Sequence, residues 1–328
     1  MIEARYYEKR DYKKVRCNLC PHNCIIGVSE KGFCLGRENR DGILYAVNYG
    51  EVVSIAMDPI EKKPLYHFYP GKEILSIATY GCNMRCPFCQ NWEISQNVIP
   101  TNFISPERLL SPVEKKKSFG VAYTYTEPMI WFEYIMDSAR LLKQNKYKVV
   151  LVTNGMINKE PLSELVEVVD GMNIDLKSMD KRWYSYLKGD LNTVLHTIRY
   201  SYEKGISIEV TNLIVTDGND SIENIKAIVD FISSISTNIP IHFSRYFPHY
   251  RYSKPATSVS LLKEAYKITK EKLNYVYVGN VLFENGNDTF CPECGNLLVK
   301  RFYYRTDVVG IEDDRCLRCG RKVDIVLQ

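Results

Sequence analysis

The sequence lacks long hydrophobic runs, and no stretch approaches the ~20 consecutive apolar residues that a membrane helix needs. It also lacks a strong excess of one charge, because 43 lysines and arginines stand against 39 aspartates and glutamates and leave a net charge of +4. So small an excess argues against a dedicated nucleic-acid-binding protein. There is no low-complexity linker and no long internal repeat. We therefore expect a soluble, cytoplasmic protein with neither a membrane nor a nucleic acid as its partner.

The composition is that of an ordinary globular protein. Hydrophobic residues make up 45% of the chain and charged residues 25%, far from the values of disordered chains. At roughly 150 residues per domain, the 328 residues are enough for two domains, or for one large domain with small appendages.

Cysteine is the informative residue, because all eleven cysteines fall into three clusters. Neighbouring cysteines are too close for ordinary structural disulfides, and the charged amino-terminal segment does not resemble an export signal. We therefore expect thiolates that bind metal in a reducing compartment. The clusters are Cys17, Cys20, Cys24 and Cys34; Cys82, Cys86 and Cys89; and Cys291, Cys294, Cys316 and Cys319.

Between Glu73 and about Gly279, short β-rich runs alternate with helical segments, which predicts βα units and a parallel sheet. Six or seven such units indicate an α/β fold, either a partial or near-complete α/β barrel or an open doubly wound sheet. In both folds we expect the catalytic and binding residues at the carboxyl ends of the strands. The expected strands are Ile74–Thr79, Val121–Tyr125, Tyr147–Val152, Met172–Leu176, Ser207–Ile214, Pro240–Ser244 and Tyr275–Val278, and the expected helices include Pro128–Gln144, Pro161–Val169, Ser221–Ser234 and Val259–Leu273.

Polar segments that carry cysteines flank this region on both sides. We expect an N-terminal cysteine-rich module over residues 1–72, a barrel over 73–284 and a cysteine-bearing tail over 285–328. Within the N-terminal module, Ile43–Tyr49 and Glu51–Ala56 are predicted to form a short hairpin.

Three cysteines are spaced CxxxCxxC directly after the first predicted barrel strand, in a loop that reads Tyr-Gly-Cys-Asn-Met-Arg-Cys-Pro-Phe-Cys. Three thiolates can hold three irons of a four-iron cluster, which leaves the fourth iron open to a small molecule. The alternative is a zinc loop that takes its fourth ligand from elsewhere in the chain. The spacing, with the aromatic Phe88 before the last cysteine, favours the cluster.

This loop resembles that of the radical SAM enzymes. The resemblance implies a [4Fe-4S] cluster on Cys82, Cys86 and Cys89, with S-adenosylmethionine bound to the open iron through its amino and carboxylate groups. It further implies reductive cleavage of that cofactor to a 5′-deoxyadenosyl radical, which takes a hydrogen atom from an unidentified small-molecule or protein substrate. An external electron donor of the flavodoxin or ferredoxin class is then required.

Residues at the ends of the later strands resemble the cofactor contacts of the activating-enzyme branch, typified by pyruvate formate-lyase activating enzyme. Thr126 and Glu127 occupy the place of a Gly-Gly-Glu-Pro stretch, although the glycines themselves are missing. Taken from the residues alone, Asp175 and Lys177 could be an ordinary ion pair, and His242 a satisfied core histidine. The cofactor-binding residues that the resemblance implies are Phe88, Thr126, Glu127, Asn154, Asp175, Lys177, Asn212 and His242.

The two flanking cysteine sets each supply four thiols. The C-terminal set forms two CxxC knuckles separated by 21 residues, a zinc-ribbon spacing that favours closed structural zinc; an iron cluster is the alternative. For the N-terminal set, spacing does not decide between zinc and a second iron–sulfur cluster, and we favour zinc. His22 lies within that set and could replace a cysteine or cap the backbone.

Over about residues 15–320 the chain resembles the AmmeMemoRadiSam system radical SAM enzymes, which carry these modules together with the segment Glu61–Gly71. We hypothesise that Lys62, Lys63 and His67 of that segment border the mouth of the active site. A glycyl-radical enzyme activase that acts on a protein partner is the alternative function. Alternatives of other classes are a zinc-ribbon nucleic-acid-binding protein and an iron–sulfur redox sensor.

Overall fold

Eight strands form the main sheet of the protein, whose computed structural model describes residues 1–283 and 285–327. Seven strands are parallel and follow one another in chain order, and β8 pairs antiparallel with β9 at one edge. Because this order never reverses, the doubly wound alternative is excluded and the sheet is that of a partial α/β barrel. From edge to edge the strands are β16 (Val276–Gly279), β15 (Ile241–Arg245), β14 (Ser207–Ile214), β13 (Gly171–Asp175), β12 (Lys148–Thr153), β11 (Gly120–Tyr123), β9 (Glu73–Ala78) and β8 (Ser54–Pro59).

The seven predicted strands are confirmed, each within two residues of its expected bounds. Their apolar residues are buried on both faces; all four residues of β11 are buried, for example. Such strands have nearly continuous hydrophobic sequences, because one face packs against helices and the other face packs inside the barrel.

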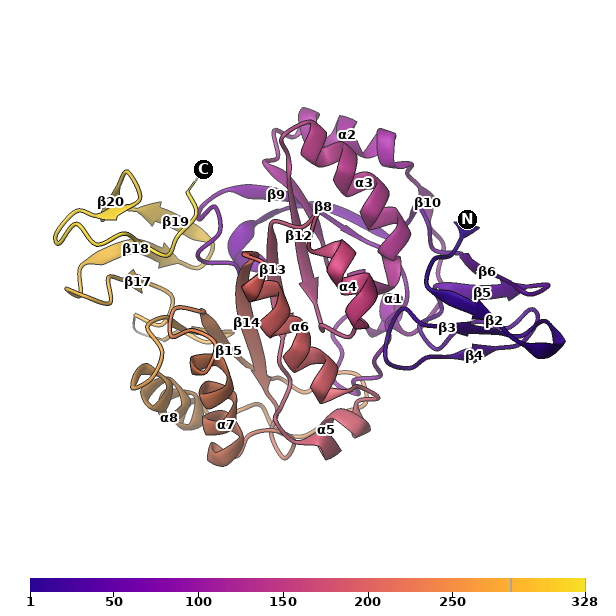
Figure 1. Ribbon diagram of the computed structural model, residues 1–328. Coiled ribbons are helices and arrows are strands. Elements are labelled where there is room, and N and C mark those ends of the chain that lie inside the picture. Colours follow the sequence, from indigo (N-terminus) through magenta and orange to yellow (C-terminus); the bar gives the residue numbers. More distant parts are fainter. Residues whose placement is uncertain (284, 328) are drawn as a thin grey trace.

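Helices cover the outer face of the sheet (Figure 1). Several begin at a serine whose hydroxyl accepts from the N–H three residues on: Ser105 from Arg108, Ser221 from Asn224 and Ser258 from Leu261. The helices are α1 (Trp92–Ser95), α2 (Pro106–Lys115), α3 (Phe132–Gln144), α4 (Lys159–Leu165), α5 (Lys181–Tyr186), α6 (Leu191–Glu203), α7 (Ile222–Ser233) and α8 (Val259–Lys270), with 3-10 turns η1 (Asp11–Lys13), η2 (Ile60–Lys62) and η3 (Pro128–Trp131).

The N-terminal module contains two small sheets, and its predicted hairpin is wrong. One sheet is β1 (Ile2–Glu3), β6 (Ile43–Ala46) and β5 (Arg37–Arg40), and the other is β2 (Tyr7–Lys9), β3 (Val15–Cys17) and β4 (Ile25–Ile26). Strand β6 thus pairs with β1 and β5, whereas β7 (Glu51–Val52) pairs with β10 (Asn102–Phe103). Gly50, with φ of +74°, turns the chain away from β6, and β8 gains a six-residue ladder on β9. The main sheet therefore begins at Ser54, before residue 73.

Residues 60–71 close the amino-terminal end of the barrel. Strand β8 runs antiparallel to β9, so Pro59 lies opposite Glu73, the first residue of β9. Beyond it, Ile60, Leu65 and Phe68 pack inside the sheet against Ile74, Ala122 and Val150. We call residues 60–71 the barrel plug.

The direction of β8 corrects the hypothesis about Lys63 and His67. Both side chains are buried, on the segment that follows Pro59 at the amino-terminal end of β9. Lys63 pairs with Asp58 at 2.6 Å, and the His67 N–H donates to Glu209 at 2.7 Å. Neither residue lines the cavity beside the C-terminal unit, whereas Lys62 does.

The C-terminal segment forms a small β unit on the side of the barrel opposite the N-terminal module (Figure 1). Its strands are β17 (Thr289–Phe290), β18 (Leu297–Phe302), β19 (Arg305–Val308), β20 (Ile311–Glu312) and β21 (Arg315–Cys316). The last residues return to the barrel plug, where the Val326 N–H donates to the His67 carbonyl at 2.7 Å. Across the described residues, no helix has both the length and the apolar character needed to cross a membrane.

Candidate functional site: the cysteine loop and the carboxyl edge of the barrel

The central cysteines lie on the loop between β9 and α1. Backbone contacts hold this loop: the Arg85 N–H donates to Leu187 at 2.9 Å, and the Cys89 N–H donates to Cys86 at 3.2 Å. Gly81, at φ of +91°, precedes the first cysteine, and a Cβ there would lie 2.2 Å from the Cys34 carbonyl oxygen. Only glycine fits so close an approach.

The electrostatics of the loop disfavour free thiolates. Burial raises the pKa of the Cys82 thiol well above its usual range and that of Cys86 to about 11, and the charges of neighbouring sulfur atoms raise both further. Buried thiols of this kind stay protonated unless a metal stabilises the thiolates. The donor set, three sulfur atoms on one tight loop, therefore fits an iron–sulfur cluster with one open iron.

Glu127 lies in the segment that follows β11, and its side chain binds residues at the end of β12. Its carboxylate accepts from the Met129 N–H at 2.9 Å, the Thr153 hydroxyl at 2.6 Å and the Asn154 N–H at 2.8 Å. Burial raises its pKa to about 7, although these donors act against the shift. The side chain thus fixes the ends of β11 and β12 relative to each other.

Tyr125 adopts a backbone conformation that glycine usually adopts, at a position where the related motif has glycine. Its φ is +67°, in the left-handed region that favours glycine. The strain is offset by its side chain, whose hydroxyl donates to Asp58 and whose ring lies 4.5 Å from the Lys63 ammonium group. Next to it, the Thr126 hydroxyl donates to the Thr79 carbonyl at 2.8 Å.

Asn154 lies beside the cysteine loop. Its amide donates to Asn83 at 2.9 Å and reaches the Cys82 sulfur at 3.8 Å. Phe88, predicted to contact the cofactor, is buried with its ring stacked on Trp183 at 6.1 Å. Both side chains therefore position the loop.

Asp175 and Lys177 form an ion pair of 2.8 Å at the end of β13, beside the cysteine loop. Burial opposes the charge of Lys177, but Asp175 and the Cys86 sulfur outweigh it and raise the pKa of the ammonium group. The Asp175 side chain keeps 36% of its surface exposed, so it can accept further hydrogen bonds. This pair is suited to a ligand that carries both hydroxyl groups and a carboxylate.

One row of inward-facing residues crosses four neighbouring strands. Asp175 of β13 lies in register with Thr211 of β14, Thr211 with His242 of β15, and His242 with Tyr277 of β16. Neighbouring strands are about 4.8 Å apart, so His242 lies about 10 Å from Asp175. Asn212 follows Thr211 and points to the opposite face, where its amide donates to the Leu176 carbonyl at 2.7 Å. Thr211, which the sequence pattern did not single out, takes its place in the row.

His242 is held by a buried carboxylate. Its Nε2 lies 2.6 Å from Glu209, and its ring stacks on Tyr277 at 5.0 Å. Burial opposes the charge of Glu209, but His242 and the polar groups of His67 lower its pKa. No sequence signal marked Glu209, because its partners come from distant segments.

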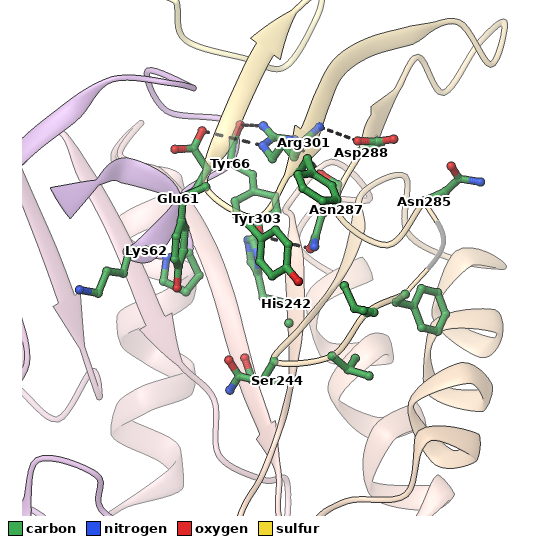
Figure 2. Close-up of a pocket in the computed structure, with 18 residues that line it drawn as sticks. Glu61, Lys62, Tyr66, His242, Ser244, Asn285, Asn287, Asp288, Arg301 and Tyr303 are labelled. Atoms are coloured by element: carbon green, nitrogen blue, oxygen red, sulfur yellow. Dashed lines mark hydrogen bonds and ion pairs between the residues drawn. The ribbon is translucent and has the colours of Figure 1, made fainter.

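A cavity of about 810 Å³ opens between the barrel and the C-terminal unit, and His242 lines it. Figure 2 shows Arg301 above the cavity, His242 and Ser244 below it, and Tyr303 over them, while Lys62 extends away from the other labelled side chains. Buried Glu61 and Arg301 meet at 3.9 Å on its wall. Among residues 1–283 and 285–327, Glu61 Oε2 and Arg301 Nε have no hydrogen-bond partner.

The four C-terminal cysteines meet as the sequence predicts. Their sulfur atoms all lie within 4.8 Å of one another. Cys291 is 3.6 Å from Cys319, and Cys294 is 3.7 Å from Cys316. The four N-terminal cysteines, Cys17, Cys20, Cys24 and Cys34, line one common cavity.

Comparison with known proteins identifies the class. The sequence model of the Radical SAM superfamily matches residues 76–232. An uncharacterized protein of Methanocaldococcus jannaschii is 44% identical over 335 residues, and the match covers 100% of both chains. The pyruvate formate-lyase 1-activating enzyme of Escherichia coli K12 is 26% identical over 46% of this chain and 65% of its own.

Among solved structures, a radical SAM methyltransferase from Sphaerobacter thermophilus has a similar fold, with a TM-score of 0.51 and 14% identity over 70% of this chain and 71% of that chain. The chain belongs to the radical SAM superfamily, and it is a radical SAM enzyme.

Proposed function

We propose that the enzyme reductively cleaves S-adenosylmethionine and uses the 5′-deoxyadenosyl radical to take a hydrogen atom from a small molecule. When bound, the [4Fe-4S] cluster and the cofactor supply the electron and the radical. The protein binds the cofactor, holds it against the cluster and keeps water out.

The observation that carries this proposal is the meeting of the cysteine loop with polar groups from successive strand ends. Lys177 lies close enough to Cys86 for their charges to interact, and Asp175 pairs with it. An ammonium group beside the cluster loop suits the cofactor carboxylate, and an exposed aspartate oxygen suits ribose hydroxyls. Thr211 and His242 continue this row toward the 810 Å³ cavity.

The cavity supports a small-molecule substrate. Its volume lies in the range of ligand sites, and its wall combines aromatic rings with a few polar groups. Glu61 Oε2 and Arg301 Nε are buried and have no hydrogen-bond partner within the described residues, so they offer one acceptor and one donor to such a ligand.

The test is anaerobic formation of 5′-deoxyadenosine by reconstituted protein with dithionite and S-adenosylmethionine. Cys86→Ala should abolish it. The matched control is Ser95→Ala, whose hydroxyl lies 3.4 Å from the Cys89 sulfur without being a ligand; it should keep most of the activity. Formation of 5′-deoxyadenosine by Cys86→Ala at the wild-type rate would overturn the proposal.

A glycyl-radical enzyme activase is the second candidate, favoured by the similarity to the pyruvate formate-lyase 1-activating enzyme of E. coli. Such an enzyme needs a partner protein that supplies the glycine. Stimulation of cofactor cleavage by a low-molecular-mass fraction of cell extract distinguishes the small-molecule reaction from it.

We further propose that the chain belongs to the AmmeMemoRadiSam branch and that its C-terminal site holds structural zinc. The three cysteine sets and the segment Glu61–Gly71 support the branch. A tetrahedral zinc with bonds of about 2.3 Å separates its sulfur ligands by about 3.8 Å. The sulfur distances of 3.6 and 3.7 Å in the C-terminal set are consistent with this separation.

A further inference from the structure

The four N-terminal cysteines differ from the C-terminal set in the spacing of their sulfur atoms. Only the C-terminal set, within residues 1–283 and 285–327, brings three or more ligand atoms within 4.8 Å of one another. The N-terminal sulfur atoms are therefore spread more widely than a single zinc ion requires. The central cysteines are spread in the same way. An iron–sulfur cluster spaces its ligands widely, because each thiolate binds a different iron.

A buried arginine marks the N-terminal cavity as a site for an anionic group. Arg37 is 1% exposed and lines the cavity together with Cys17 and Cys34. Its Nη1 donates to Glu133 at 2.7 Å, but Nε and Nη2 have no partner in the part of the chain that the structure describes. Unpaired buried donors are costly, so these two N–H groups fit a ligand with acceptor atoms. The thiolates and sulfides of an iron–sulfur cluster are such acceptors.

The segment that carries the N-terminal cysteines is in direct contact with the central cysteine loop. His22 Nε2 lies 2.7 Å from the Asn83 carbonyl, next to Cys82. Arg85 donates to the Phe33 carbonyl, next to Cys34, and its guanidinium group lies 3.9 Å from the Phe33 ring.

The approach of Gly81 to Cys34 limits the distance between the two cysteine sets. A Cβ on Gly81 would lie 2.2 Å from the Cys34 carbonyl oxygen. Consecutive Cα atoms are 3.8 Å apart, so the Cα atoms of Cys34 and Cys82 lie within about 10 Å of each other.

We propose that Cys17, Cys20, Cys24 and Cys34 bind a second iron–sulfur cluster, which passes electrons to the central loop. The site itself stands on the sulfur spacing and on Arg37; the electron-transfer role rests on the proposed function. This assignment replaces our expectation of zinc at the N-terminal set.

The electron balance is one electron per cleavage. A reduced one-electron donor of the ferredoxin or flavodoxin class is oxidised and reduces the N-terminal cluster. That cluster returns to its oxidised state when it reduces the central cluster. The electron is consumed when the C–S bond of S-adenosylmethionine breaks to give methionine and the carbon-centred radical. Because Glu133 balances its charge, Arg37 would act on the N-terminal cluster through its two free N–H donors, which favour the reduced form.

The first experiment leaves the N-terminal cysteines intact. The triple variant Cys82→Ala, Cys86→Ala, Cys89→Ala is reconstituted anaerobically with iron and sulfide, and iron, sulfide and zinc are measured. We expect about four irons per chain and, after dithionite reduction, a paramagnetic resonance signal that S-adenosylmethionine does not change. A triple variant that holds two zincs and no iron would overturn the proposal. That result would leave cofactor cleavage by the wild type, and thus the proposed function, untouched.

The second experiment tests the electron path. The double variant Cys20→Ser, Cys24→Ser is assayed for 5′-deoxyadenosine with dithionite and, separately, with a reduced ferredoxin. We expect cleavage with dithionite, which also shows that the variant folds, and at least tenfold less cleavage with ferredoxin than in the wild type. Equal rates with ferredoxin in variant and wild type would contradict the electron path. If the variant does not fold, the triple variant decides instead: ferredoxin must reduce its remaining cluster, and failure to do so contradicts the path.

Discussion

At the scale of single residues, the site depends on side chains that hold other groups in place. Glu127 accepts from three donors at once, and Asn154 reaches both Glu127 and the Cys82 sulfur. Tyr125 keeps a left-handed backbone in the position where the related motif has glycine. The sequence motif located Glu127 correctly, but it could not reveal the contact of the Tyr125 hydroxyl with Asp58, because Asp58 lies 67 positions away.

We predict that Glu127→Gln keeps the iron but weakens cofactor binding. The amide has one oxygen where the carboxylate has two, so one of the Thr153 and Asn154 donors loses its acceptor. Loss of one buried hydrogen bond costs about 1–2 kcal/mol, or roughly tenfold in affinity. Titration of the reconstituted variant with S-adenosylmethionine measures it. Unchanged affinity would show that Glu127 has no part in shaping the cofactor site.

We predict that His67 makes the protein less stable in acid. Its Nδ1 lies 2.7 Å from the Asp324 carbonyl and its Nε2 lies 2.6 Å from the Tyr277 hydroxyl, so the neutral ring fits the site. Burial lowers its pKa to about 4, from 6.5 in the unfolded chain. Between these values the unfolded state binds the extra proton, so stability falls as the pH falls through this window.

Urea unfolding at pH 7.5 and pH 5 of the wild type and of His67→Asn measures this effect. The wild type should lose about 2 kcal/mol more than the variant, since one pKa unit corresponds to about 1.36 kcal/mol. Equal losses in both proteins would show that His67 is already protonated in the folded state.

At the scale of elements, the sequence predicted the seven parallel strands of the main sheet. It did not predict that β8 pairs with β9 at the edge of that sheet. A buried parallel strand can be predicted from its own run of hydrophobic residues. The predicted bounds of β14, for example, are those observed. The pairing of β8 with β9 depends on the direction in which the chain leaves Gly50, which no local pattern specifies. For that reason the predicted hairpin was wrong, and of Lys62, Lys63 and His67 only Lys62 lines the cavity.

We predict that the barrel plug contributes strongly to stability. Leu65 is fully buried inside the amino-terminal end of the barrel, so Leu65→Ala should cost about 2–5 kcal/mol in the free energy of unfolding. The matched control is Leu282→Ala, because Leu282 is 78% exposed and its truncation should change stability by at most about 0.5 kcal/mol. A small effect of Leu65→Ala, equal to that of the control, would mean that the plug is loosely held.

At the scale of the whole molecule, three cysteine sets occupy three places around one barrel. The N-terminal set contacts the central loop, whereas the C-terminal unit lies across the barrel and supplies Arg301 and Tyr303 to the cavity. The sequence predicted all three sets because ligand spacing is local. It could not predict the cavity, whose wall joins Glu61, His242 and Arg301 from distant parts of the chain.

We predict that filling the cavity separates substrate use from cofactor cleavage. Ser244→Phe places a ring at the base of the cavity, whereas Ser260→Phe, on the exposed start of α8, serves as the control. With dithionite alone, both variants should form 5′-deoxyadenosine at the wild-type rate. A low-molecular-mass fraction of cell extract should accelerate the control and the wild type but not Ser244→Phe. Equal acceleration of all three would place the substrate elsewhere.

The most direct test of the whole account is the content of iron, sulfide and zinc in protein purified and reconstituted without oxygen. We expect about eight irons, about eight sulfides and about one zinc per chain, for two iron–sulfur clusters and one structural zinc site. Zinc without iron after reconstitution would contradict it, because the central cysteine loop would then hold no cluster on which the cofactor could be cleaved.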